Sequence, residues 1–244
     1  MISIPSFFRK RLPAIDFSIL KTDMHSHLIP SIDDGSKSVE DSILIIQSLM
    51  NLGFSNFITT PHVMPDYYNN DNETILEGSK KVLDALSMMD IAVDFYTSAE
   101  YYIDFEFQKR ISENSLLYFG DKYILVEFSF VNFPNNFFDI LFDLQVKGYR
   151  VILAHPERYT YLTLKDYIDF VDKGLLLQIN LLSLVGYYGP HVTRCAKILI
   201  ENELISFAGT DCHNLQQSEN LKKCFTNKYW HQLVNSDKLK NHTL

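Results

Sequence analysis

The chain has 244 residues, and its 22 Lys and Arg against 30 Asp and Glu give a formal net charge of −8 with histidine neutral. This balance argues against a nucleic-acid-binding protein, because such proteins gain affinity from basic residues that neutralise phosphates. Hydrophobic residues make up 46% and charged residues 21%, which excludes disordered, collagen-like and coiled-coil classes. Roughly 250 residues is near the upper size of one hydrophobic core, so we expect one domain over residues 1–244.

Residues 1–18 are expected to form an N-terminal leader. The basic cluster Arg9-Lys10-Arg11 follows the apolar residues Phe7 and Phe8, which reverses the order found in a secretory signal. This short segment could contact a membrane surface or a partner, or it could simply pack on the domain. No apolar run approaches the roughly 20 residues that span a bilayer, and three cysteines do not suggest a disulfide framework. We therefore predict a cytoplasmic protein without a transmembrane segment.

Seven apolar runs have the length of β-strands. Most are continuous rather than alternating, as in ILVEF at 124–128, which is typical of strands buried on both faces of a parallel sheet. The predicted strands cover residues 19–24, 54–59, 92–98, 123–128, 149–154, 175–180 and 204–208.

Helical spacing follows most of these runs. Ser38 and Asp41 form a near capping box before apolar residues at helical spacing, and Gly53, Gly148 and Gly174 are predicted C-terminal stops. Further helices are predicted at 73–89, 136–147, 164–173 and 189–202, and residues 215–244 read as a C-terminal helical tail. The repeat predicts an α/β fold, a (β/α)7 barrel, with an open doubly wound sheet as the alternative.

Imidazole and carboxylate side chains fall at or just past the ends of six of these strands. The carboxyl ends of parallel strands in a barrel lie on one rim, so these side chains would share one pocket. His25 and His27 are two residues apart on an extended segment and would face the same way, and Asp211 and His213 repeat this spacing. Each motif alone could be incidental, and Asp33-Asp34-Gly35 alone could be a turn. Together they indicate a site for several metal ions, for which imidazole and carboxylate donors suit Mn, Fe or Zn.

The motifs HSH, DDG, TPH, SAEYY, LVEF, AHPERY and GTDCH, in this order over roughly residues 22–214, resemble the PHP (polymerase and histidinol phosphatase) superfamily. Within it, the chain is similar to the bacterial capsule and exopolysaccharide tyrosine phosphatases. The resemblance implies a distorted (β/α)7 barrel of PHP type that binds three divalent metal ions, with Mn favoured and Fe or Zn as alternatives. The implied metal ligands are His25, His27, Asp34, His62, Glu100, Glu127, His155, Asp211 and His213.

The resemblance also implies roles for single residues. Glu100 would bridge metal ions, while Asp33 and Asp23 would orient their neighbours instead of binding metal. The expected catalytic residues are Arg158, His155 and His62: Arg158 would bind phosphate and stabilise developing charge, and a histidine near the rim could donate a proton. Family members carry a second arginine shortly after the last motif, whereas this chain continues from His213 through Asn214 to Ser218 without one.

The implied activity is metal-assisted hydrolysis of a phosphomonoester, most directly of phosphotyrosine on a protein such as a bacterial tyrosine kinase that controls capsule synthesis. Two alternatives stay open: a small-molecule phosphatase such as a histidinol phosphatase, and a non-catalytic phosphotyrosine-binding module.

Cysteine-based phosphatase chemistry needs the motif Cys-x5-Arg. After Cys195, Cys212 and Cys224, the residues at the arginine position are Glu201, Ser218 and Trp230. The cysteines are therefore predicted to be packing residues. Three tyrosines beside the motifs could wall a phenyl-phosphate pocket: Tyr101, Tyr102 and Tyr159.

Overall fold

A computed structural model describes residues 12–244, so Phe7, Phe8 and the basic cluster that follows them lie outside the described residues. Parallel strands occupy all seven predicted positions, which confirms the α/β class with parallel sheets. They are β1 (Thr22–Asp23), β2 (Asn56–Thr59), β4 (Asp94–Thr97), β6 (Tyr123–Glu127), β7 (Arg150–Ala154), β8 (Leu176–Asn180) and β9 (Ile205–Gly209).

Two of the seven positions are interrupted and resume as separate short strands. After β2 the chain breaks at Thr60-Pro61 and continues as β3 (His62–Val63), and after β4 it breaks at Ser98-Ala99 and continues as β5 (Glu100–Tyr102). Proline cannot donate to a strand ladder, which explains the first break. The hydrogen bonds therefore define two sheets, β1-β2-β4 and β3-β5-β6-β7-β8-β9, instead of one continuous barrel.

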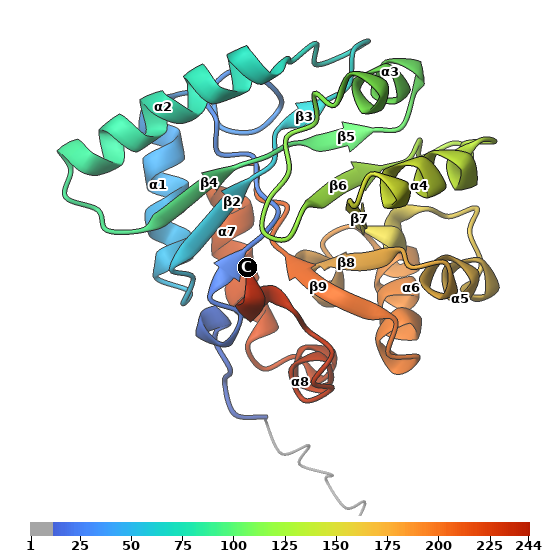
Figure 1. The fold of residues 1–244 in the computed structure, drawn as a ribbon. Helices are drawn as coiled ribbons and strands as arrows, with labels where there is room; N and C mark the ends of the chain where they lie inside the picture. The colour runs from blue at the N-terminus through green and yellow to red at the C-terminus, as the bar shows by residue number, and fades with distance from the viewer. Residues whose placement is uncertain (1–11) are drawn as a thin grey trace, which may run out of the picture.

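Helices lie around the outside of the strands (Figure 1). They are α1 (Val39–Met50), α2 (Asn72–Met88), α3 (Phe105–Glu113), α4 (Phe137–Val146), α5 (Leu164–Asp172), α6 (Pro190–Glu201), α7 (Leu215–Leu221) and α8 (Lys228–Val234). The predicted cap of α1 is confirmed, because the Ser38 side chain accepts a hydrogen bond from the Asp41 N–H. Gly53, Gly148 and Gly174 all have positive φ after their helices, as C-terminal stops require. Helix α3 was not predicted, since only Phe107 and Ile111 of its nine residues are buried.

The first and last strands meet along a seam. At its upper end Ser26 and Cys212 form a parallel bridge beyond the ends of β1 and β9. At its lower end the Asn241 side chain lies between the strands, donating to the carbonyl oxygens of Thr22 and Ala208 and accepting from the Ala208 N–H. The C-terminus accordingly lies beside β1 and β9 (Figure 1).

Alternation along each strand separates two apolar clusters. In β6, Ile124 and Val126 belong to the large cluster beneath the helices, whereas Leu125 points to the opposite face. Leu125 belongs to a smaller cluster inside the ring of strands, formed by Met24, Ile58, Phe119, Tyr123, Leu125, Ile152, Ala154 and Phe207. This small cluster fills one half of the interior, called the lower half below. Polar side chains occupy the other, upper half, at the carboxyl ends of the strands.

Among residues 12–244, no helix combines the length and the apolar character that crossing a membrane requires.

Candidate metal centre

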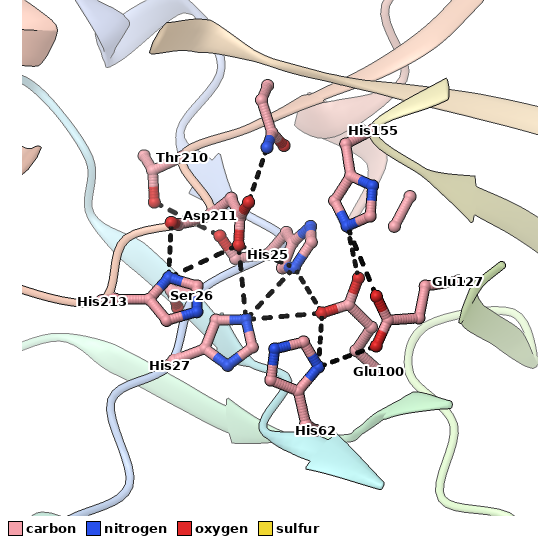
Figure 2. A network of polar contacts seen from close by, with 12 residues as sticks. His25, Ser26, His27, His62, Glu100, Glu127, His155, Thr210, Asp211 and His213 are labelled. Atoms are coloured by element: carbon pink, nitrogen blue, oxygen red, sulfur yellow. Dashed lines mark hydrogen bonds and ion pairs between the residues drawn. The ribbon is translucent and has the colours of Figure 1, made fainter. Parts of the chain in front are cut away.

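The predicted donors converge at the carboxyl end of the strands (Figure 2). They lie at the ends of six of the seven strand positions or in the loops beyond them, and most are buried even though they are ionisable. His25 and His27 follow β1, His62 begins β3, Glu100 begins β5, Glu127 ends β6, His155 follows β7, and Asp211 and His213 follow β9. The breaks after β2 and β4 are thus the places from which His62 and Glu100 enter the cluster.

Glu100 lies at the centre of the cluster and is fully buried. Its Oε2 is 3.1 Å from His25 Nε2, 3.3 Å from His62 Nδ1 and 3.5 Å from His27 Nε2. Its other oxygen, Oε1, is 2.9 Å from His155 Nε2. One carboxylate therefore contacts four imidazoles from three different strand ends.

Asp211 forms a second centre beside Glu100. Its Oδ1 lies 3.4 Å from both His25 Nε2 and His27 Nε2, and 3.6 Å from His213 Nδ1. The other oxygen, Oδ2, accepts a hydrogen bond of 2.6 Å from Asn180 Nδ2 and lies 3.4 Å from Arg158 Nη1. Asp211 thus connects the buried histidines to the arginine at the edge of the cluster.

Glu127 and Asp34 approach the cluster from its outer side. Glu127 Oε1 is 3.0 Å from His62 Nδ1, and its other oxygen is 3.9 Å from His155 Nε2. Asp34 Oδ1 is 3.4 Å from His213 Nε2 and 3.6 Å from His62 Nε2, and the Asp34 side chain is 55% exposed. All nine predicted ligands therefore lie in one connected network.

Two histidines are oriented by partners outside this set. His27 Nδ1 is 2.8 Å from Asp33 Oδ2, a carboxylate oxygen that accepts. His25 Nδ1 is 2.8 Å from Gln178 Oε1. Gln178 Nε2 donates to Asn180 Oδ1, and Asn180 Nδ2 in turn donates to Asp211. These two hydrogen bonds fix the orientation of both amides. Each Nδ1 carries the hydrogen, so each Nε2 faces the cluster, as in histidines that bind metal.

The charges in the cluster shift the pKa values of its members in opposite directions. Burial would lower the pKa of His62, but the negative charges of Glu100 and Glu127 outweigh it and raise that pKa to about 9. Burial would raise the pKa of Glu100, yet the charges of His25 and His62 hold it well below its ordinary value. The Glu100 carboxylate is therefore ionised and attracts positive charge, which protons or metal ions can supply.

The donor set fits divalent cations. Three overlapping groups have donor atoms within 4.8 Å of one another, and these groups are His27, Asp34, His62 and His213; His25, His27, Glu100 and Asp211; and His62, Glu100 and Glu127. The Nε2 atoms of His25 and His27 are 3.3 Å apart and both face carboxylate oxygens. With the hydrogen held on each Nδ1, such close lone pairs are stable only with a cation between them or an added proton, and mixed nitrogen and oxygen donors suit Mn, Fe or Zn.

Two of the predicted ligands occupy a strained backbone conformation. His155 has φ of 36° and Asp211 has φ of 51°, in the left-handed region that non-glycine residues seldom adopt. Such conformations cost on the order of 1–3 kcal/mol and are concentrated at functional sites. Here they occur where the chain turns at the ends of β7 and β9.

A cavity of about 300 Å³ opens beside the cluster. Arg158 lines it, with its guanidinium 4.5 Å from the centroid of the Phe130 ring and 5.0 Å from that of Tyr188. This sandwich fixes the plane of the guanidinium. The cavity is lined by Asp34, His62, Glu127, Phe130, Arg158, Tyr188, Asp211, His213, Asn214 and Gln217.

The aromatic wall of this cavity differs from the prediction. Tyr101 and Tyr159 are buried in the core, where the Tyr101 hydroxyl accepts from the Leu117 N–H and the Tyr159 hydroxyl donates to the Ala154 carbonyl. Neither these two tyrosines nor Tyr102 lines the cavity, so this prediction was wrong. Phe130 and Tyr188 take that place, and both come from loops that carry no distinctive motif.

Gln178 and Asn180, which orient His25 and Asp211, were not predicted. The sequence did hold a signal for them, because two amides in the otherwise apolar strand β8 are fully buried and need hydrogen-bond partners.

The cysteines lie apart from the chemistry. Cys212, between two predicted ligands, is fully buried in the large apolar cluster, and burial raises the pKa of Cys195 and Cys224 to about 12.

Comparisons with known proteins agree with this geometry. Residues 21–241 match the family described as "Capsular polysaccharide synthesis, CpsB/CapC". The chain is 32% identical to the tyrosine-protein phosphatase YwqE of Bacillus subtilis, over 80% of this chain and 78% of that protein. It is 27% identical to the tyrosine-protein phosphatase CpsB of Streptococcus pneumoniae, over 79% of this chain and 83% of that protein.

Solved structures give the same relationship. A chain from the crystal structures of YwqE from Bacillus subtilis and CpsB from Streptococcus pneumoniae, described as unique metal-dependent tyrosine phosphatases, matches with a TM-score of 0.76 and 30% identity. The match covers 88% of this chain and 91% of that chain. An amidohydrolase from Mycoplasma synoviae, 14% identical with a TM-score of 0.50, shares the fold over 97% of this chain and 89% of its own.

Proposed function

The chain belongs to the CpsB/CapC family of capsular polysaccharide synthesis, and from this premise we infer that it is a metal-dependent tyrosine-protein phosphatase. The observation that carries the inference is the buried histidine and carboxylate cluster, which opens into a cavity that also holds Arg158. A cation cluster beside a fixed guanidinium suits a dianionic phosphoryl group.

We propose that the nine predicted residues hold the cations, and that three Mn ions bind. The three overlapping donor groups support this number, and the membership of Glu100 in two of them supports a bridging role. When bound, the cations supply Lewis acidity and an activated water for hydrolysis of a phosphomonoester. His155 and His62 approach opposite oxygens of Glu100 and hold this arrangement in place.

Arg158 is the residue that we assign to the phosphoryl group. Its pKa stays high because the Asp211 carboxylate outweighs the effect of burial, so the guanidinium remains charged. The ion pair with Asp211 and the stacking on Phe130 and Tyr188 hold it at the cavity before substrate arrives. A preorganised cation of this kind stabilises the charge that develops on phosphoryl oxygens in the transition state.

The substrate that we propose is phosphotyrosine on a protein, specifically on a bacterial tyrosine kinase that controls capsule synthesis, in the cytoplasm. The relatives named tyrosine-protein phosphatases support the phosphotyrosine assignment. A tyrosyl oxygen has an ordinary pKa near roughly 10, so it departs with less help from a general acid than an alkyl oxygen needs.

Turnover with purified protein tests this assignment. We expect Mn²⁺-dependent hydrolysis of a phosphotyrosine peptide that a chelator abolishes and added Mn²⁺ restores, with slower hydrolysis of histidinol phosphate. Arg158→Lys keeps the charge but loses the planar fork, so we expect its rate to fall by about 10²-fold or more with metal content unchanged. Activity that survives the chelator would contradict the metal dependence, and activity on histidinol phosphate alone would contradict the tyrosine assignment.

A further inference from the structure

Two side-chain amides line the cavity together with Arg158. Gln217 lies in α7 and is 9% exposed, and Asn214 precedes that helix and is exposed. Both contribute to the wall of the 300 Å³ cavity. Arg158 is the one permanently charged cation among the lining residues that the structure describes, so any further contacts to an anion must come from neutral donors or from bound cations.

The orientation of the Gln217 amide follows from its hydrogen bond. The backbone N–H of His213 donates to Gln217 Oε1 over 2.6 Å. A backbone N–H can only donate, so the atom that faces it must be the oxygen and the amide NH₂ must lie at the other corner. This NH₂ donates to no residue within 12–244, and the residue, 9% exposed, borders the cavity.

Asn214 is fixed by the same logic. Its Oδ1 accepts from the backbone N–H of Gln217 over 3.0 Å, and its side-chain NH₂ has no acceptor in the described part of the chain. The two amides therefore present NH₂ groups whose orientation is set by backbone donors, so ordering them costs little when a ligand binds.

We propose that Gln217, assisted by Asn214, donates hydrogen bonds to the phosphoryl oxygens of the substrate from the wall that it shares with Arg158. This proposal rests on the proposed phosphatase function and assigns the phosphate contact left open by the absence of an arginine between Asn214 and Ser218. Neutral donors hold the phosphoryl group without adding a second fixed positive charge beside His213, which is itself a proposed cation ligand.

The test separates donating to phosphate from merely supporting His213. Gln217→Glu keeps an oxygen for the His213 N–H but replaces the NH₂ by a carboxylate oxygen, whereas Gln217→Ala removes both contacts. Gln216→Glu places the same charge on an exposed neighbouring position and controls for net charge. Each protein is loaded with Mn²⁺, its metal content is measured, and the dissociation constant of inorganic phosphate is determined by calorimetry beside KM and kcat for a phosphotyrosine peptide.

We expect Gln217→Glu to raise the phosphate dissociation constant and KM by about 10-fold to 100-fold, the usual range for a lost hydrogen bond to a charged group. Gln216→Glu should stay within about twofold of the parent chain, because exposed charges are screened. If Gln217→Glu binds phosphate like the parent and only Gln217→Ala is impaired, Gln217 merely supports His213 and the proposal is wrong.

Asn214→Asp provides an independent arm, because Asp caps a helix as well as Asn and the side chain at 214 makes no hydrogen bond to His213. This variant should bind phosphate more weakly than the parent chain, but the loss should be smaller than in Gln217→Glu. Normal phosphate binding by Asn214→Asp, together with loss of metal from Gln217→Glu, would overturn the proposal. Phosphate affinity is measured without turnover. A parent chain that binds phosphate through Gln217 but hydrolyses no phosphotyrosine would therefore contradict the proposed function and leave this inference standing.

Discussion

The same strands supply apolar side chains to the lower half of the barrel interior and ionisable side chains to the upper half. In β6, Leu125 belongs to the small apolar cluster of the lower half, and Glu127, two residues on and on the same face, belongs to the metal centre of the upper half. Both side chains are nearly inaccessible to solvent. The lower half is filled by an apolar cluster, whereas the upper half concentrates carboxylates whose charge needs a cation.

The apolar side chains of the lower half therefore stabilise the fold, whereas the ionisable side chains of the upper half serve the reaction. Removal of apolar contacts should lower the free energy of unfolding and leave cation binding intact. Changes in the upper half should affect cation binding and catalysis far more than folding, because the protonated histidines can neutralise the carboxylates in place of cations.

The largest effect is expected from Glu100→Gln, which keeps the shape of the central side chain and removes its charge. We expect lost metal content and a fall in phosphotyrosine turnover beyond the roughly 10–100-fold typical of residues that only orient ligands. Elemental analysis and kinetics measure both quantities. Glu106→Gln removes a charge from exposed helix α3 and should change neither, and equal behaviour of the two variants would contradict the central role of Glu100.

Leu125→Ala addresses the lower half. The side chain is fully buried, so the cavity that it leaves should lower the free energy of unfolding by about 2–5 kcal/mol, measured by denaturant titration. Metal content per folded molecule should not change. Leu44→Ala, at a half-exposed position on α1, should cost much less, and loss of metal from folded Leu125→Ala would show that the two halves are not independent.

Asp33→Asn affects the orientation of a proposed ligand instead of a proposed ligand itself. Asp33 accepts from His27 Nδ1 and from the backbone N–H groups of His62 and Gly35, and the charge of His27 outweighs burial to lower its pKa to about 2. We expect metal affinity to fall by about 10–100-fold. Asp90→Asn, an exposed change at positive φ, is the matched control. Unchanged affinity in Asp33→Asn would mean that His27 needs no partner.

The last prediction concerns pH. The pKa of His62 is raised to about 9, so at pH 7 its ring holds a proton that a cation must displace. Cation binding should release protons into a weakly buffered solution, and apparent Mn²⁺ affinity should rise by up to about tenfold per unit from pH 7 to 8.5. The raised pKa also stabilises the cation-free fold at low pH, and this contribution is lost as pH rises through 9. Affinity that does not depend on pH would contradict the coupling.

The strand positions and the convergence of the histidines and carboxylates could be predicted from the sequence because both depend on local patterns: continuous apolar runs for strands buried on two faces, and ionisable residues directly after them. The sequence did not predict α3, whose apolar stripe consists of two residues. Gln178 and Asn180 were missed because their role depends on hydrogen bonds between strands. Phe130 and Tyr188 were missed because only the folded loops bring them to Arg158.

The seam between β1 and β9 also sets the order in which the molecule can be assembled. The Asn241 side chain bonds to Thr22 across 219 positions, and Thr210 bonds to Asp23 across 187 positions. Contacts of such separation form late, because a long loop must close first. His25 and His27 therefore meet Asp211 and His213 only after residue 213 has left the ribosome, so a chain shorter than this cannot complete the phosphatase centre.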